Sequence, residues 1–330
     1  MATIRLPALA GTLLLLPALG LAQHIVSARA GLIHYSDGRV LLNEKPIVHK
    51  ASQFEEVKAG EYLRTERGRA EVLLTPGVFV RLGEDTQVQM LSTRLSDVQL
   101  RIMKGAAVIE ADELTPETSV RVTVGETQVK LERNGLYRFD ATSDEDPRLR
   151  VFSGEASVTA RSADHRLKAK KEMDLAGDFT IRKFDPEDTD PLDRWSRRRA
   201  NYLAVANVSA SRMVYERGDR YSASRWIWNP YYGMYTFLPV RGVIWSPYGY
   251  GFYSPRAVYV LYNPPRPAVN SAGFGAPSRA YSPSYGYNTV GQTSAGNSGV
   301  VASSPSSGAN QSGGATVSRG GDTGGGGARR

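Results

Sequence analysis

The sequence predicts an all-β protein: a sandwich or roll of about a dozen short strands, followed by a short helix, an aromatic-rich segment and a disordered tail. Two observations carry this prediction. Over short runs in the first 185 residues, apolar and polar residues alternate, which places every second side chain on one face of a strand. Glycine, proline, asparagine and aspartate interrupt these runs at short intervals, as is typical of turns between strands. No helical period of useful length occurs before residue 190.

The clearest alternation lies between Arg67 and Met90, where we expect three short strands joined by two tight turns. The first turn is at Pro76-Gly77, a pair that suits a type II turn because proline fixes φ and glycine accepts a positive φ. The second turn is at residues 83–85. The residues expected to face the core are Ala70, Val72, Leu74, Val78, Val80, Leu82, Val88 and Met90, with Phe79 and Arg81 on the opposite face.

Further strands are expected on both sides of this stretch. They cover residues 25–27, 31–35, 40–42, 98–102, 107–111, 120–124, 127–131, 137–139 and 179–184, together with two strands on either side of a turn at Ser153-Gly154, one around Val151 and one at 156–160. The turns expected between them are Asp37-Gly38, Lys104-Gly105, Gly125-Glu126 and Asn134-Gly135. Among these, the Asp-Gly and Asn-Gly pairs are the strongest signals of a two-residue hairpin.

The central stretch also resembles the periplasmic domain of the FecR family, the iron-dicitrate sensor type. The resemblance covers roughly residues 26–184 and consists of turn-and-strand motifs. These motifs are the step at residues 59–65, Arg67-Gly68-Arg69-Ala70-Glu71, Pro76-Gly77, Val80-Arg81-Leu82-Gly83, Asp85-Thr86 and Ser153-Gly154-Glu155-Ala156. Motifs of this kind specify a fold better than an activity.

The resemblance implies a non-enzymatic module that acts by binding. In FecR-type proteins this domain passes information between an outer-membrane transporter and a cytoplasmic sigma factor. Many members carry a cytoplasmic anti-sigma segment before one membrane helix, and we recognise neither in this sequence. We therefore expect an envelope sensor or scaffold whose partner is an envelope protein or a glycan, and not a complete anti-sigma regulator.

Residues 1–22 have the pattern of a secretory signal peptide. Arg5 supplies the positive charge, residues 6–19 form the apolar region, and Gly20-Leu21-Ala22 places small residues before a cleavage site at Gln23. The apolar run contains prolines and is shorter than the roughly 20 residues of a spanning helix. We therefore expect export to the periplasm or the outside of the cell, with no transmembrane segment after cleavage. The absence of cysteine excludes disulfides, thiol catalysis and a lipid-modified cysteine.

A helix is expected to begin at Asp190-Pro191, because aspartate is a good N-cap and proline suits the first helical position. Asp193 lies in the first turn, where it favours the helix dipole. One face should hold Leu192, Trp195, Tyr202 and Ala206, interrupted by Arg199. The run Arg197, Arg198 and Arg199 is either a solvated helix face or a contact with an anionic surface, such as phospholipid headgroups or an anionic glycan.

Residues 221–262 contain an aromatic repeat, in which Trp228-Asn229-Pro230-Tyr231 recurs 17 residues later as Trp245-Ser246-Pro247-Tyr248. One interpretation is two tight hairpins whose rings pack on each other or on the β module. The other is a platform of exposed rings that stack on sugar faces. The candidate ligand or glycan contacts are Trp226, Trp228, Tyr231, Tyr232, Trp245 and Tyr248.

The composition predicts five segments. These are a signal peptide at 1–22, a FecR-like β domain at 23–185, a helical connection at 186–220, the aromatic segment at 221–262 and a disordered Gly/Ser-rich tail at 263–330. From this division we expect a fragment that ends at Asp185 to fold by itself. A fragment that ends at Tyr262 should melt like the whole mature protein.

No motif for catalysis or for a cofactor is present. The four histidines form no metal-binding pair, and there is no nucleophile elbow, phosphate-binding loop or dinucleotide fingerprint. Adjacent carboxylates fall in predicted loops. The sequence thus predicts no catalytic residue, no metal and no cofactor. The net charge of +8 would suggest nucleic acid in a cytosolic protein, but the signal peptide argues against that partner. The alternative function is binding of carbohydrate or cell wall through the aromatic repeat.

Overall fold

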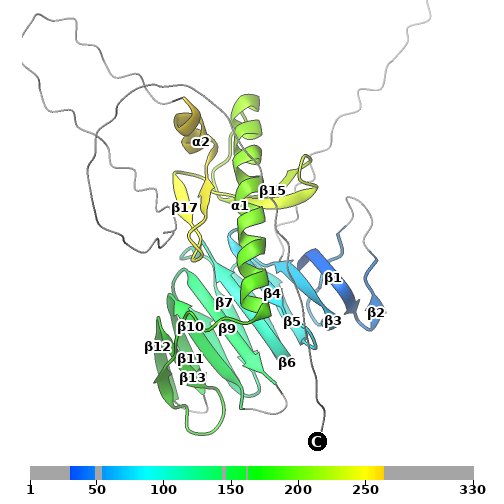
Figure 1. Ribbon diagram of the computed structural model, residues 1–330, viewed down its shortest axis with the longest axis vertical. Coiled ribbons are helices and arrows are strands. Elements are labelled where there is room, and N and C mark those ends of the chain that lie inside the picture. Colours follow the sequence, from blue (N-terminus) through cyan, green and yellow to red (C-terminus); the bar gives the residue numbers. More distant parts are fainter. Residues whose placement is uncertain (1–29, 49–53, 143–145, 161–162, 264–330) are drawn as a thin grey trace, which may run out of the picture. The chain divides into compact units, whose positions relative to one another are not determined.

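The computed structural model describes residues 30–48, 54–142, 146–160 and 163–263 (Figure 1). All of them belong to one compact unit, Met1–Ala268, and none belongs to the second unit, Val269–Arg330. The predicted signal peptide at 1–22, the predicted strand at 25–27 and, apart from Asn263, the predicted tail lie outside the described residues.

The all-β class is confirmed. Among the described residues, fourteen strands join in one hydrogen-bonded sheet, and four more form two separate hairpins. The strands of the sheet are β1 (Leu32–Leu42), β2 (Lys45–Pro46), β3 (Tyr62–Leu73), β4 (Val78–Leu82), β5 (Gln87–Arg94), β6 (Asp97–Ala111), β7 (Val120–Val124), β8 (Thr127–Leu131), β9 (Gly135–Ala141), β10 (Arg148–Ser153), β11 (Glu155–Ala160), β12 (Ala163–Lys168), β13 (Lys171–Asp174) and β14 (Ile181–Lys183). After them come α1 (Pro191–Arg217), the hairpin β15 (Arg225–Asn229) and β16 (Met234–Leu238), the hairpin β17 (Val243–Trp245) and β18 (Gly251–Tyr253), and α2 (Pro255–Tyr262).

The long strand β6 joins two layers of the sheet. Its first half lies between β5 and the parallel strand β7, and its second half lies between β4 and β9. From β6 two wings extend, β7-β8-β11-β12 and β9-β10-β13-β14. Buried residues of both wings share one hydrophobic core, for example Val129 of β8 and Met173 of β13. The fold is therefore a β-roll, in which one strand turns the corner between layers.

Two predicted turns are bends within a strand. β6 continues through Lys104-Gly105, where Gly105 has a φ of 91°. A Cβ added at Gly105 would lie 2.4 Å from Thr86 Oγ1, so there is no room for a side chain at this position. β1 likewise continues through Asp37-Gly38 with a register shift, and Gly38 faces Gly68 of β3. The hairpin after β1 is instead at Asn43-Glu44, which both adopt a positive φ. Both predicted turns were wrong, because at these positions glycine allows the backbones of neighbouring strands to come close together within the sheet.

The predicted hairpin at Asn134-Gly135 is also wrong. Gly135 begins β9, but β9 pairs with β6 and β10, whereas the preceding strand β8 pairs with β7 and β11. The Asn134 amide instead accepts from Leu114 N–H and donates to the carbonyl of Asp112. Here the chain crosses from one layer to the other, which a local two-residue signal does not reveal.

The two turns at Pro76-Gly77 and Gly125-Glu126 are confirmed. The first joins β3 to β4, with Val78 N–H donating to Thr75 O at 2.8 Å and Gly77 at a φ of 82°. The second joins the antiparallel pair β7 and β8. The predicted inward face of this region is buried in the main core, so the register of β3, β4 and β5 is also confirmed.

We predict that Val80→Asp unfolds the protein. Val80 is fully buried in the main core, where an unpaired charge costs several kcal/mol, against a total stability of about 5–15 kcal/mol for a domain. Gln89→Asp is the matched control, because Gln89 lies between the buried residues Val88 and Met90 and faces the other way. Circular dichroism and urea unfolding of both variants provide the measurement. A stable Val80→Asp protein would contradict the core assignment.

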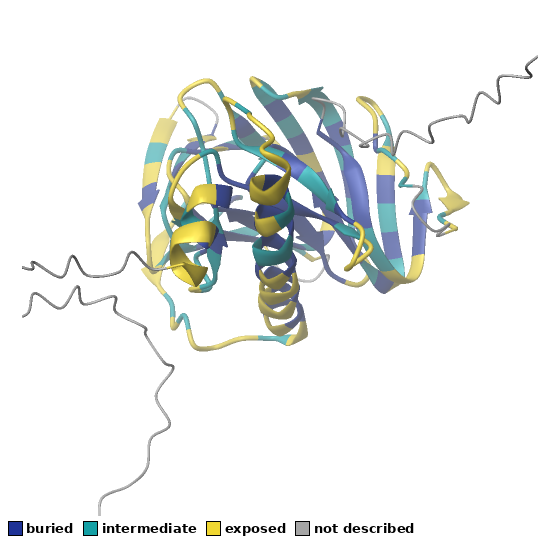
Figure 2. Ribbon diagram, turned by 90° about the horizontal axis from the view of Figure 1, so that it is seen from above, coloured by how far each residue is buried: buried dark blue, intermediate teal, exposed yellow. Residues whose placement is uncertain are grey.

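The start of α1 agrees with its prediction. Asp190 is the N-cap, its side chain accepts from the N–H groups of Leu192 and Asp193, and Asp193 accepts from Asp190 N–H in return. The predicted face is only partly right. Tyr202 is 57% exposed, because the buried stripe runs through Arg199 and Leu203 instead. Figure 2 shows buried and exposed residues alternating along this helix, as expected when one face is packed.

Candidate functional site

The segment after the β-roll packs on the roll. We call residues 191–262 the C-terminal cover; it comprises α1, the two hairpins and α2, and it lies over β1, β3 and β4 (Figure 1). A second hydrophobic cluster joins the cover to the sheet and contains Leu32, Leu73, Phe79, Leu203, Ala204, Trp226, Tyr235, Phe237 and Phe252. The ring centroids of Phe79 and Trp226 are 5.0 Å apart in an edge-to-face contact. Both faces of β4 are therefore buried.

A charged network lies inside this interface. The guanidinium of Arg81 is fully buried and donates from Nε to Glu71 at 2.7 Å and from Nη1 to Glu110 at 2.5 Å. Glu71 also accepts from Arg199 Nη2 at 2.8 Å and from His34 Nδ1 at 2.9 Å. Two carboxylates thus face two guanidinium groups, so the buried charges are balanced.

Three parts of the C-terminal cover bond to this network. α1 contributes Arg199, β16 contributes Tyr235 N–H, which donates to His34 Nε2 at 3.0 Å, and the segment after β17 contributes Ser246, whose hydroxyl bonds to Glu110. Because Nε2 accepts, His34 is neutral with its proton on Nδ1. The network fixes where the cover sits, because a shift of any of these elements would leave a buried charged or polar group without a hydrogen-bond partner.

The environment shifts the pKa of several groups in this interface, among them Glu71, His34 and Asp112. Burial favours the neutral form of Glu71, but Arg199 and Arg81 outweigh it and hold the pKa of Glu71 well below its usual value. Burial lowers the pKa of His34. Asp112 next to Glu110 behaves oppositely: burial, followed by the charge of Glu110, raises its pKa well above the usual value.

We predict that acid destabilises the protein through His34. An unfolded chain binds the His34 proton near pH 6.5, whereas the folded chain binds it only at lower pH. Stability should therefore fall as the pH falls from about 7 to 5.5, by at most about 1.4 kcal/mol per pH unit for this group. Asp112 acts with the opposite sign, and Glu71 loses its contribution only below its unfolded pKa.

Urea unfolding at several pH values, compared with His34→Gln, isolates the contribution of His34. The substitution keeps a hydrogen-bonding side chain beside Glu71 but removes the titration. The variant should show a shallower fall in stability over this range. Equal slopes for the two proteins would contradict the assignment.

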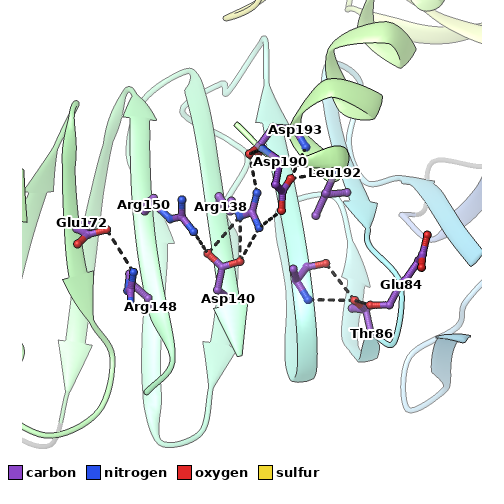
Figure 3. A network of polar contacts seen from close by, with 11 residues as sticks. Glu84, Thr86, Arg138, Asp140, Arg148, Arg150, Glu172, Asp190, Leu192 and Asp193 are labelled. Carbon is purple, nitrogen blue, oxygen red and sulfur yellow. Dashed lines mark hydrogen bonds and ion pairs between the residues drawn. The ribbon is translucent and has the colours of Figure 1, made fainter. Parts of the chain in front are cut away.

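A second polar cluster anchors the start of α1 (Figure 3). Arg138 of β9 donates to Asp193 and to Asp190 at 2.6 Å each, and it also bonds to Asp140. Arg150 of β10 donates to the same Asp140 at 2.9 Å. Burial opposes the charge of Arg138, but its aspartates raise its pKa, so it stays charged. The N-terminus of α1 is thereby attached to the sheet at β9.

The outer side of the C-terminal cover is hollowed by two grooves that share residues of α1. The larger one, which we call the α1 groove, has a volume of about 580 Å³ and is lined by Val205, Val208, Ser209, Arg212, Met213, Glu216, Tyr231, Tyr232 and Tyr262. The smaller groove, of about 340 Å³, lies between α1 and α2. The rings of Tyr215 and Tyr259 stack beside it, with centroids 4.3 Å apart.

The structure distributes the six predicted aromatic contacts over different environments. Trp226 is buried in the second hydrophobic cluster, and Trp228 is half-buried against Tyr235. Tyr248 is half-buried, and burial raises the pKa of its enclosed hydroxyl. The other three rings are exposed, namely Tyr231, Tyr232 and Trp245. Only Tyr231 and Tyr232 line a common groove.

The predicted arginine run is likewise divided. Arg197 and Arg198 are exposed, whereas Arg199 is buried and bonded to Glu71. Arg199 is therefore not available to an anionic surface in this structure.

The sequence analysis does not predict the buried network, because it places Arg81 on the outer face of its strand, and Glu71 alternates with the inward-facing Ala70 and Val72. A signal was present, because Leu73 and Phe79 on the same face are apolar. An outer face that carries large apolar residues beside charged ones indicates a second layer. Within the described ranges, no group of three or more His, Asp or Glu residues is placed to hold a metal ion. None of the described helices is long and apolar enough to cross a membrane.

Comparison with known families agrees with this geometry. Residues 61–174 match the family model "FecR protein", a segment that extends through most of the roll from β3 to β13. This part of the chain is similar to the FecR family. The residues that match the family model are thus those that form strands β3 to β13 of the roll.

Two solved structures of a candidate anti-sigma factor from Parabacteroides distasonis are also similar. One, at 2.50 Å resolution, is 14% identical, with a TM-score of 0.33, and covers 41% of this chain and 62% of that chain. The other, at 1.65 Å, is 16% identical, with a TM-score of 0.33, and covers 43% of this chain and 64% of that chain. This chain therefore spans less than two thirds of their length. No curated protein matches the sequence.

Proposed function

We propose that this protein is an exported, non-enzymatic FecR-type module that acts by binding, as an envelope sensor or scaffold. The single observation that carries the proposal is the match to the FecR family at residues 61–174, since that family is regulatory. The signal-peptide pattern at 1–22 supports export. We further propose that the partner is an envelope protein.

The arrangement of charged groups supports a role in binding. Glu71, Arg81, Glu110 and Arg199 neutralise one another inside the protein. In the α1 groove the charged pair is Arg212 and Glu216, joined at 2.8 Å. Charges that are already paired hold the fold together or tune recognition, whereas a catalytic acid or base must face the substrate.

We predict that the exported protein begins at Gln23. The small residues Gly20 and Ala22 stand where a signal peptidase cleaves, and the charged and apolar regions precede them. N-terminal sequencing of the extracytoplasmic fraction measures this. Protein that keeps Met1 and stays in the membrane fraction would contradict it.

Deletion and complementation in the host test the proposed function. Deleting the gene should change transcription of envelope genes if the protein is a sensor, or the composition of the envelope alone if it is a scaffold. The full chain should restore the wild type, and a chain without residues 1–22 should not. Restoration by that cytoplasmic form, or no effect of the deletion, would contradict the proposal.

A second candidate function is binding of carbohydrate or cell wall. Each copy of the aromatic repeat leaves one large ring open to solvent, since Tyr231 is 80% exposed and Trp245 is 61% exposed. Exposed rings of this kind can stack on sugar faces. Binding of the mature chain to cell-wall fragments, weakened in Tyr231→Ala and Trp245→Ala but not in the exposed control Tyr62→Ala, would support this function. Equal binding by all three variants would show that Tyr231 and Trp245 do not contact the cell-wall ligand.

A further inference from the structure

We propose that the α1 groove binds an acidic polypeptide segment that carries apolar side chains. This inference rests on the proposed function of the protein as a binding module, and it names the surface and the chemistry of the partner. Three features of the C-terminal cover lead to it: the residue types that line the groove, the charge of the cover as a whole and the apolar side chains in the lining.

The lining of the groove combines residues that are favoured at protein interfaces. Val205, Val208 and Met213 of α1 line it together with Tyr231, Tyr232 and Tyr262. Tyrosine, methionine and arginine are enriched at protein–protein interfaces, because they supply contact area together with a polar group. Neither Val205 nor Tyr231 belongs to a core cluster of the described protein, so the fold itself does not account for them.

The charge of the C-terminal cover as a whole favours an acidic partner. The C-terminal cover contains ten arginines and no lysine, against the three acidic residues Asp193, Glu216 and Asp219. Eight of the arginines are exposed, whereas Arg199 is held in the buried network. A surface of this sign attracts acidic segments and accelerates their encounter. Two copies of the same basic surface would repel each other, which argues against self-association at this site.

The apolar part of the lining favours a polypeptide over a glycan. Sugar hydroxyls placed on Val205 and Val208 would lose their hydrogen bonds with water, whereas apolar side chains gain from burial there. Arg212 in the lining donates to Glu216 at 2.8 Å, so a carboxylate of the partner can take the place of Glu216.

Selection of random peptides on the full-length chain tests the proposal. The selected peptides should carry a net negative charge together with apolar side chains. Val205→Glu should weaken their binding by about tenfold or more, because it places an acidic group in the groove lining. The matched control is Met103→Glu on β6, since Met103 is 50% exposed and Val205 is 44% exposed. This control should bind like the wild type.

Arg212→Gln tests the electrostatic part separately. It should weaken peptide binding and reduce its salt dependence, since a charged contact is lost. Equal thermal melting of all three variants shows that they fold. Selected peptides without an acidic bias, or binding that is unaffected by Val205→Glu, would overturn the proposal.

Two further measurements separate the other occupants. Sedimentation with phosphatidylglycerol vesicles that is lost in Val205→Glu would assign the groove to a membrane surface. A dimer in light scattering that is lost in the same variant would assign it to a second copy, and either result would overturn the proposal. Failure of the proposed function is distinct, because gene deletion would then have no effect even if acidic peptides bind the groove.

Discussion

A fragment that ends at Asp185 should aggregate or lose most of its stability. Without the C-terminal cover, Leu32, Leu73 and Phe79 lose the side chains that bury them. Burial of one large apolar side chain is worth roughly 1.5–3 kcal/mol, so several such losses approach the stability of a domain. The sequence alone predicts the opposite, that this fragment folds, and the truncated chain decides between the two predictions.

A fragment that ends at Asn263 is the matched control. It keeps α1, both hairpins and α2, so it should melt like the mature protein. Size-exclusion chromatography and thermal melting of the two fragments provide the measurement. A soluble fragment ending at Asp185 with the melting temperature of the full chain would show that the roll does not need its cover.

Replacement of Arg81 by leucine should destabilise the protein by about 3–5 kcal/mol. The substitution leaves Glu110 buried with Ser246 as its remaining partner in the network, and it removes one of the two guanidinium groups that hold Glu71. Urea unfolding measures the loss. We attribute this loss of stability to the buried carboxylate that is left without a counter-charge, and not to the absence of the arginine side chain itself.

The double substitution Arg81→Leu with Glu110→Leu separates these two causes. It removes both partners of one buried pair and leaves Glu71 bonded to Arg199 and His34. The double variant should therefore recover much of the stability that the single variant loses. If it is no more stable than Arg81→Leu, the charge balance of the network is not what holds this interface.

The sequence predicts strands and turns well where the signal is local. Pro76-Gly77 and the N-cap at Asp190 act through the conformation of a few residues, and both are found as predicted. Asp37-Gly38 carries an equally strong signal, yet it bends a strand, because Gly38 must pass Gly68 at close range. Whether such a glycine forms a turn or a bend within a strand depends on residues distant in the sequence, and a local pattern carries no information about them.

The candidate site was harder to predict for a related reason. The alternation in β4 shows that Val80 faces a core, but it does not say whether Arg81 on the other face meets water or protein. The answer depends on the C-terminal cover, whose Arg199 bonds to the same Glu71 as Arg81 and follows Arg81 by more than a hundred residues. The aromatic repeat is visible in the sequence, but the two uses proposed for it depend on how far each ring is exposed. Trp226 turned out buried and Trp245 exposed.

The short connection between the roll and its cover has a consequence for competition. Only residues 184–190 separate the end of β14 from the start of α1. A tether of this length holds the cover near the sheet at an effective concentration on the order of millimolar. A free molecule that bound the face of β3 and β4 as tightly as the cover does would have to be present above this millimolar concentration to displace the cover. The cover therefore remains on this face over a wide range of competitor concentrations in solution.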